Sequence, residues 1–168
     1  AADPLFVSGY TGINGGFVIG VADDPGMHSS QNEQDSRHYA IAAKLPMLEP
    51  SDSAEAKDFV KVAFELSEKY DTPVIFRTCT RIAHSQCAVA LEEPLAQTKK
   101  EYVKNPQKYI MAPANAIRKH PVVEARGKAL TEFAETCSLN RVELSDGSKL
   151  GIITSGTCYQ YVKELYGD

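Results

Sequence analysis

Two short stretches of the chain predict strands, and the first of them is apolar throughout, a pattern typical of a parallel strand buried on both faces. The first is GGFVIGVA, residues 15–22, and the second is VIFRTC, residues 74–79. Between them, RHYAIAAKLPML (residues 37–48) has the spacing of a short helix followed by a third strand. A polar loop, residues 23–35, leaves the carboxyl end of the first strand.

The clearest helical period of the chain lies in PSDSAEAKDFVKVAFELSEKY, residues 50–70. The predicted core face of this helix consists of Ala56, Phe59, Val60, Ala63 and Leu66. Asp52 and Glu55 have the spacing of a capping box at its start, and Pro73 follows its end. A strand, a helix and a strand of these lengths predict a right-handed parallel crossover, and therefore an α/β fold.

The second half of the chain is less regular. Residues 91–140 are charged, and we interpret them as a connector that is first extended and then helical from about Pro121 to Cys137. Residues 141–168 predict a turn at Asp146 and Gly147, a short strand KLGIIT (residues 149–154) and an amphipathic helix. The domain organisation we expect is therefore 1–90, 91–140 and 141–168, with the last piece beginning a second α/β unit.

Composition narrows the class of protein. The 168 residues carry a net charge of -4, with 43% hydrophobic and 24% charged residues, which suits a globular domain. An acidic chain with no long apolar run predicts no nucleic-acid partner and no membrane span. The four cysteines are far apart and contain no Cys-x-x-Cys pair, so we expect reduced thiols in a cytoplasm, and no zinc or iron–sulfur site.

The polar loop DDPGMHSSQNEQD, residues 23–35, is the main candidate for a site. Ligands of open α/β sheets bind outside the carboxyl ends of the strands, where this loop and RTCTRIAHSQ (residues 77–86) both lie. The alternative is a solvated loop whose side chains satisfy their own backbone.

A metal site of Asp23, Asp24, His28 and His38 is a weaker alternative, because no ligand repeat places them together. His84 and Ser85 do not suggest a nucleophile pair, because neighbours on an extended segment face opposite ways.

The order of these segments resembles a known family. GGFVIGVADDPGMHSSQNEQDSRHYA, PMLEPSDSAEAKDFV and TPVIFRTCTRIAHSQ look like the large (alpha) subunit of indolepyruvate:ferredoxin oxidoreductase, as do YIMAPANAIRKH and KLGIITSGTCYQYV. The resemblance covers the whole chain, as an internal piece of that subunit. It implies an incomplete thiamine diphosphate-binding domain of the pyrimidine type, with a parallel sheet, followed by the start of a transketolase C-terminal-like unit.

The resemblance also implies an activity. Enzymes of this family oxidatively decarboxylate aryl pyruvates from aromatic amino acid catabolism in anaerobes, forming an acyl-CoA and reducing ferredoxin. Their cofactors are thiamine diphosphate, Mg²⁺ and [4Fe-4S] clusters, and their partners are a small (beta) subunit, ferredoxin and coenzyme A. The activating Glu, the diphosphate motif and the cysteine clusters have no counterpart here, so no catalytic residue is assigned and the isolated chain should be inactive. The alternatives are a pyruvate- or 2-oxoglutarate-type enzyme, or a non-catalytic assembly module.

By resemblance, the polar loop faces the substrate side of the thiamine site. Related pyruvate enzymes carry an Arg that faces the substrate carboxylate where this chain has Gln34 or Asp35, so another cation has to hold that charge. Arg77 and Arg81 are the candidates, and the alternative favoured for either is a solvated or structural arginine. The substrate- or cofactor-facing residues we predict are His28, Ser29, Ser30, Gln31, Asn32, Gln34, Asp35, Arg37, Arg77 and Arg81. No metal ligand is predicted in this chain.

Overall fold

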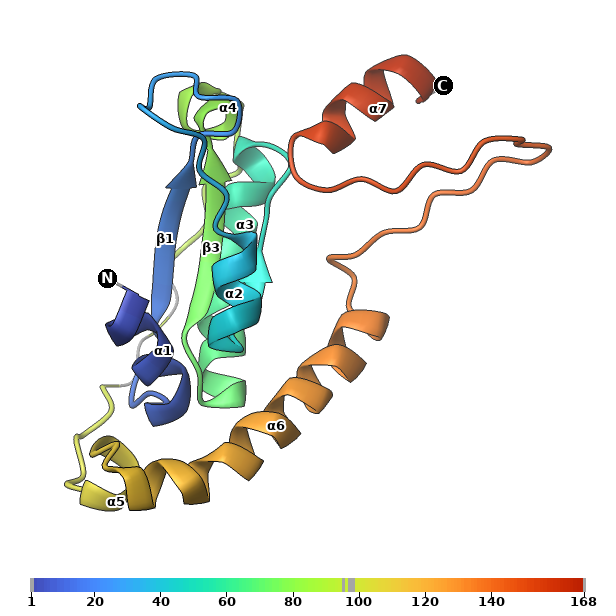
Figure 1. The fold of residues 1–168 in the computed structure, drawn as a ribbon. Helices are drawn as coiled ribbons and strands as arrows, with labels where there is room; N and C mark the ends of the chain where they lie inside the picture. The colour runs from blue at the N-terminus through green and yellow to red at the C-terminus, as the bar shows by residue number, and fades with distance from the viewer. Residues whose placement is uncertain (1, 95, 97–98, 168) are drawn as a thin grey trace.

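A parallel sheet of three strands organises the part of the chain that the computed structural model describes, residues 2–94, 96 and 99–167 (Figure 1). The strands are β1 (Val18–Asp23), β2 (Met47–Leu48) and β3 (Val74–Cys79), in the order β1-β3-β2. Val18 of β1 lies opposite Val74, and Met47 of β2 lies opposite Ile75. The predicted α/β class and all three predicted strands of residues 15–79 are confirmed.

Helices cover both faces of this sheet and extend away from it. They are α1 (Ala2–Thr11), α2 (Arg37–Ala43), α3 (Ser53–Tyr70), α4 (Thr80–His84), α5 (Pro106–Tyr109), α6 (Pro113–Thr136) and α7 (Cys158–Tyr166). Figure 1 shows the loop after β1 and helix α4 together at one end of the sheet, with α5 and part of α6 at the other end. The end that carries the loop is the carboxyl edge of the strands, where the candidate site was predicted.

Helix α3 starts and stops at the residues that the sequence pattern indicates. The side chain of Asp52 accepts the N–H of Glu55 at 2.8 Å, and the side chain of Glu55 accepts the N–H of Ser51 at 2.6 Å. This reciprocal arrangement satisfies N–H groups that have no partner inside the helix. At the other end Asp71 adopts a left-handed conformation with φ 50°, which stops the helix. The predicted cap at Asp52 is confirmed, and the return hydrogen bond of Glu55 goes to the N–H of Ser51 in place of that of Asp52, the partner in a standard capping box.

The core is divided by the sheet into two clusters. Alternate residues of β3 point to opposite faces, so Val74 packs with Ala63 and Leu66 of α3, while Ile75 packs with Ala40 and Ala43 of α2. Val74, Ile75 and Ala63 are each at most 1% exposed. Strand β3 is therefore the central element on which both helical layers rest.

Strand β1 is less buried than its apolar sequence predicts. Val18 packs on the α3 cluster, but Gly20 and Ala22, which lie on the same face, are exposed. Among the described residues, β1 pairs with β3 alone and forms one edge of the sheet. The prediction that both faces of this strand are covered is wrong, because continuous apolar character does not distinguish an edge strand from a central one.

The long helix α6 begins earlier than predicted. The sequence indicated a start near Pro121, but α6 starts with Pro113 at its first position and continues through Pro121. Proline is favourable at a helix start, because the N–H it lacks would have no partner there, and this signal at Pro113 was missed. The guanidinium of Arg126 anchors α6 by donating to the carbonyl oxygens of Gly9 and Asp71. Neither α6 nor any other helix in the described ranges combines enough length and apolar character to cross a bilayer.

The last segment confirms one helix and one turn but no strand. Helix α7 is present where an amphipathic helix was predicted, and Asp146 and Gly147 form the predicted turn, with φ +74° at the glycine. The predicted strand 149–154 is wrong for this chain, because no described segment pairs with it and Ile153 is fully exposed. A strand requires a neighbour for its N–H and C=O groups, and a sequence pattern does not supply one.

Candidate functional site

The polar loop after β1 is organised by the buried carboxylate of Asp24. Its Oδ2 accepts the N–H groups of Ser29 at 2.8 Å and Ser30 at 2.7 Å, and its Oδ1 accepts the hydroxyl of Thr80 at 2.6 Å. The hydrogen bond from Thr80 and those from the loop hold the pKa of Asp24 well below its usual range. The loop is therefore ordered from within by an acid that satisfies its backbone, as the alternative interpretation of this segment required.

The neighbouring Asp23 connects the end of β1 to helix α2. Its carboxylate oxygens accept the N–H and the hydroxyl of Ser36 at 2.7 Å each, and Ser36 immediately precedes α2. Asp24 thus fixes the middle of the loop, and Asp23 fixes its end. In the described ranges, no group of three or more His, Cys, Asp or Glu side chains comes together to hold a metal, so the alternative metal site is not supported.

Arg77 occupies the centre of a buried charge network on the α2 face of the sheet. The arginine is 4% exposed, and its Nε donates to Asp23 at 2.5 Å while its Nη1 pairs with Glu49. Asp35 lies 3.8 Å from its Nη2. Because β3 lies between the other two strands, a cation on β3 meets carboxylates from both sides. The charge of Arg77 is therefore already compensated inside the fold.

Asp35 and Arg37 form a second ion pair at the end of the loop. The guanidinium donates from Nε to Asp35 at 2.9 and 3.1 Å and from Nη2 at 2.7 Å, a two-pronged geometry. The hydrogen bond from Arg37 holds the pKa of Asp35 well below its usual range, and the same bond raises the pKa of Arg37. This pair closes the loop onto α2 and compensates a further cation.

The remaining predicted residues of the loop face solvent. His28, Gln31, Asn32 and Gln34 are exposed, and Asn32 donates from its side chain to the carbonyl oxygen of Glu33 at 3.0 Å. Gly26 and Met27 adopt left-handed conformations, with φ +72° and 57°, and turn the chain immediately before His28. The side chain of His28 is thereby brought beside helix α4.

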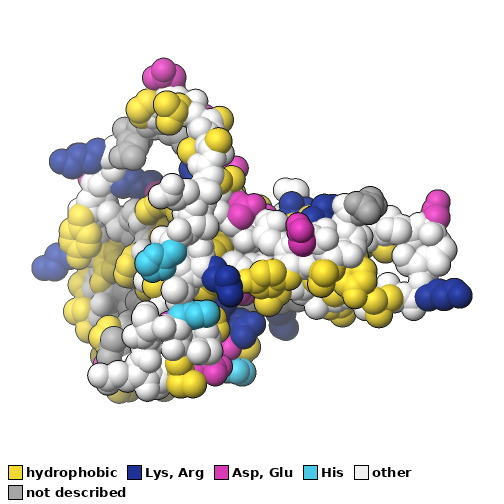
Figure 2. Space-filling model, turned by 90° about the horizontal axis from the view of Figure 1, so that it is seen from above, with side chains coloured by type: hydrophobic (Ala, Val, Ile, Leu, Met, Phe, Trp, Pro, Cys, Tyr) yellow, Lys and Arg dark blue, Asp and Glu magenta, His cyan; other side chains and the backbone are white. Residues whose placement is uncertain are grey.

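A shallow cavity of about 380 Å³, largely open to solvent, lies between this loop and α4. It is lined by His28, Thr80, Arg81, His84 and Ser85. Figure 2 views this end of the molecule and shows histidine side chains close to Lys and Arg side chains on one face. The cavity thus brings two of the predicted site residues, His28 and Arg81, together with three that were not predicted.

Three lining residues were missed because of a wrong secondary-structure interpretation. We expected the segment after β3 to be extended, whereas Thr80–His84 is helix α4. Arg81 and His84 are three residues apart, which places them on one helical face. That spacing was the signal in the sequence that could have identified His84.

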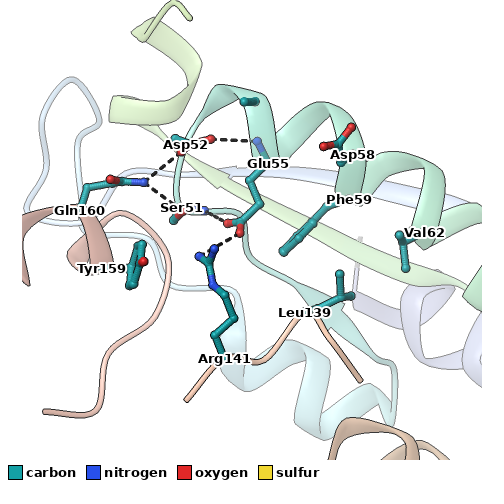
Figure 3. A pocket seen from close by; sticks show the side chains of 11 residues that line it. Ser51, Asp52, Glu55, Asp58, Phe59, Val62, Leu139, Arg141, Tyr159 and Gln160 are labelled. Atoms are coloured by element: carbon teal, nitrogen blue, oxygen red, sulfur yellow. Dashed lines mark hydrogen bonds and ion pairs between the residues drawn. The ribbon is translucent and has the colours of Figure 1, made fainter. Parts of the chain in front are cut away.

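A second cavity, of about 400 Å³, lies between the start of α3 and the C-terminal segment (Figure 3). Gln160 of α7 donates to Asp52 at 2.9 Å and to the hydroxyl of Ser51 at 3.2 Å. Arg141 donates to Glu55 at 3.2 Å across the cavity. These contacts join the C-terminal segment to the capped end of α3, so we interpret this cavity as a packing gap between two parts of the chain.

Comparisons with known proteins identify curated relatives over nearly the whole chain. The subunit "Indolepyruvate oxidoreductase subunit IorA" of Archaeoglobus fulgidus is 43% identical over 168 residues, that of Pyrococcus horikoshii 48% over 172, and that of Methanothermobacter marburgensis 45% over 165. These alignments cover 96–98% of this chain and 26% of each relative. No family model matches the chain, and no solved structure matches it.

The similarity extends over nearly the whole chain but over only part of each relative. The chain spans about a quarter of the length of the curated relatives it matches, and six of them share the same printed name. The overall identity is 42–48%, and the alignments leave out only a few residues of the chain. Over nearly its whole length, the chain is therefore similar to one segment of the indolepyruvate oxidoreductase IorA subunits.

Proposed function

We propose that the chain forms part of a cytoplasmic oxidoreductase subunit that oxidatively decarboxylates aryl pyruvates, above all indolepyruvate. The products are the acyl-CoA and reduced ferredoxin, and the partner is a small (beta) subunit. The observation that carries this proposal is the 42–48% identity, over nearly the whole chain, to subunits named for indolepyruvate oxidation. The chain supplies one segment of such a subunit, as the relatives' greater length indicates.

The fold supports a place on the pyrimidine side of a thiamine diphosphate site. We assign residues 1–90 to part of the pyrimidine-binding domain, residues 91–140 to a connector and residues 141–168 to the start of a transketolase C-terminal-like unit. A parallel sheet with loops gathered at its carboxyl edge is the architecture in which such ligands bind. Bound thiamine diphosphate would supply the electron sink for loss of carbon dioxide.

The residues of this chain do not fit the other groups that the family requires. The described residues contain no cluster of His, Cys, Asp or Glu that could hold Mg²⁺ or an iron–sulfur cluster. All four cysteines are free, with Cys79 buried and Cys87 and Cys158 exposed. We therefore assign no step of the reaction to a metal or a cluster held by this chain.

The role of the chain's own residues is to shape the substrate side of the site. In this proposal, Asp24 holds Ser29 and Ser30 in place, and the loop around them presents polar side chains at the carboxyl edge: His28, Ser29, Ser30, Gln31, Asn32 and Gln34. Asp35, Arg37 and Arg77 fix the loop to the sheet through the two charge networks. A loop fixed in this way orients a polar ligand with little further loss of conformational freedom.

The experiment is an anaerobic assay of the complete, co-expressed complex for coenzyme-A-dependent dye reduction. Indolepyruvate, phenylpyruvate, pyruvate and 2-oxoglutarate are compared, and we expect the highest kcat/KM with the aryl pyruvates. Preference for pyruvate or 2-oxoglutarate would reassign the substrate within the wider family. No turnover of any 2-oxoacid by a cofactor-loaded complex would refute the enzymatic proposal.

A variant near the end of the loop tests whether the loop lies at the substrate. Gln34→Ala should lower kcat/KM for indolepyruvate, because the exposed amide is available to a ligand. Gln107→Ala is the matched control, since Gln107 is also exposed but lies on α5 at the opposite end of the sheet (Figure 1). Equal kinetics for both variants would limit the loop to a structural role.

A non-catalytic assembly module is the second candidate function. It is favoured by the exposed apolar side chains of the C-terminal segment, where Val142, Leu144 and Ile153 are at least 84% exposed. If the complex turns over 2-oxoacids and the loop variants have no effect, the chain contributes assembly contacts to an enzyme whose substrate site lies elsewhere.

A further inference from the structure

The cavity between the loop and α4 is distinguished by its charge. Its lining residues, His28, Thr80, Arg81, His84 and Ser85, include one permanent cation and two imidazoles, and none of them carries a carboxylate. His28, Arg81 and His84 are all exposed, so their polar atoms are accessible to a ligand. An anion is the class of ligand that such a lining favours.

Arg81 differs from the other two arginines of the candidate site in having no carboxylate partner. Arg77 pairs with Asp23 and Glu49, and Arg37 pairs with Asp35. Arg81 forms no ion pair within the described part of the chain, and its guanidinium carbon lies 5.6 Å from the centre of the Tyr161 ring. A guanidinium over an aromatic ring keeps its N–H donors at its rim, where a carboxylate can accept two of them.

The nearest acid is arranged so that it does not neutralise this cation. Asp24 lies behind Thr80, whose hydroxyl donates to it, and its oxygens also accept the N–H groups of Ser29 and Ser30. Asp24 is 4% exposed, so its charge is directed into the loop and away from the cavity. Thr80 therefore separates the acid of the loop from the basic residues of the cavity.

The geometry points to this cavity as the binding site of the carboxylate of a 2-oxoacid, with Arg81 as the charged contact and His28 and His84 as hydrogen-bond donors. An imidazole has an N–H donor in either protonation state, so both histidines can contribute. This inference rests on the proposed function for the identity of the acid. The sequence left Arg77 and Arg81 as alternatives for the carboxylate contact. The structure favours Arg81, because the charge of Arg77 is already paired with Asp23 and Glu49.

The histidines themselves provide a direct measurement of binding. The chain has only four, at positions 28, 38, 84 and 120, so their imidazole proton resonances can be followed by NMR. On titration of the 168-residue chain with phenylpyruvate, we expect the signals of His28 and His84 to shift and those of His38 and His120 to stay. Phenylacetone, which lacks the carboxylate, should shift none of them.

Arginine variants and other small molecules show whether a shift of the histidine NMR signals comes from a carboxylate bound at Arg81. Arg81→Gln should abolish the shifts, Arg81→Lys should retain part of them, and Arg118→Gln, at an exposed arginine of α6, should leave them unchanged. Equal shifts with phenylacetone, or uniform shifts of all four histidines, would overturn the inference. Shifts with inorganic phosphate but not with phenylpyruvate would overturn the carboxylate and leave a phosphate site.

Kinetics of the complete complex provide the second readout. Arg81→Gln should raise the KM for indolepyruvate about 10- to 100-fold, the range expected for loss of one charge-assisted contact, with a smaller change in kcat. Unchanged KM in an active complex would overturn the carboxylate assignment and leave the proposed function intact. A wild-type complex that turns over no 2-oxoacid would remove the proposed function, while the titration would still decide whether the cavity binds the acid.

Discussion

Replacement of Arg77 by methionine should destabilise the fold strongly, although the substitution lies near the candidate site. Methionine has a similar length and no polar atoms, so it fills the position without adding a new charge. The substitution leaves Asp23, which is 3% exposed, without its cationic partner. Ser36 continues to donate to Asp23, but neither of its groups carries a charge.

The magnitude follows from the burial of the pair. Removing one member of a buried ion pair costs about 3–5 kcal/mol, because the other charge stays buried without compensation. Glu49 contributes less than about 1 kcal/mol, since its side chain is 21% exposed and can regain water. With a denaturant slope near 2 kcal/mol/M, the urea midpoint should fall by about 1.5–2.5 M, measured by circular dichroism.

Arg81→Met is the matched control for this experiment. The side chain of Arg81 is exposed and has no carboxylate partner among the described residues, so the expected loss is below about 0.5 kcal/mol. In an Asp23→Asn background, the cost of Arg77→Met should fall by at least about 1 kcal/mol, because no buried charge is then stranded. A loss below about 1 kcal/mol for Arg77→Met, or an equal loss for the two arginine variants, would refute the reasoning.

Three further predictions concern the start of α3, the turn after α1 and the β1 loop. Asp52→Ala removes the acceptor at the start of α3 and should lower the free energy of unfolding by about 1 kcal/mol in urea titrations; an unchanged midpoint would contradict the cap. Gly12→Ala should cost at least about 1–2 kcal/mol, because φ is +78° and the new Cβ would lie 2.6 Å from the carboxylate of Asp71, whereas Gly15→Ala meets no atom within 4 Å and serves as its control. The pKa of Asp24 is lowered from 3.8 in the folded state, so its charge stabilises the fold above about pH 4, and this contribution is lost as the pH falls. The Tm difference between wild type and Asp24→Asn should therefore be large at about pH 7 and shrink towards about pH 2; a constant difference would contradict this assignment.

Local signals in the sequence were sufficient for the first half of the fold. Alternation, capping and turn residues act over a few neighbours, so α3 with its cap at Asp52 and the strands around it were predictable. The exposure of Gly20 and the lack of pairing in residues 149–154 depend on which other segments are adjacent, and no local pattern contains that information.

The location of the candidate site could be predicted from the sequence, but most of the residues that line it could not. The rule that ligands bind at the carboxyl ends of parallel strands directed attention to the correct edge of the sheet. The partners of Arg77 depend on the strand order β1-β3-β2, which brings together Asp23 and Glu49, 26 positions apart in the chain. The helical conformation of Thr80–His84 was also missed, so the spacing of Arg81 and His84 was not used, although it could have indicated that His84 lines the site.

The strand order also determines when the sheet can form during synthesis. β1 and β2 are not paired with each other, and each is bonded to β3, which is made last of the three. The ribosome must add residues 24–73 before β3 begins to emerge, which takes roughly 3–10 s at about 5–20 residues per second. Throughout that interval β3, the strand with which VIGVA pairs among the described residues, has not yet been made, so a pause in translation within α3 would delay this pairing.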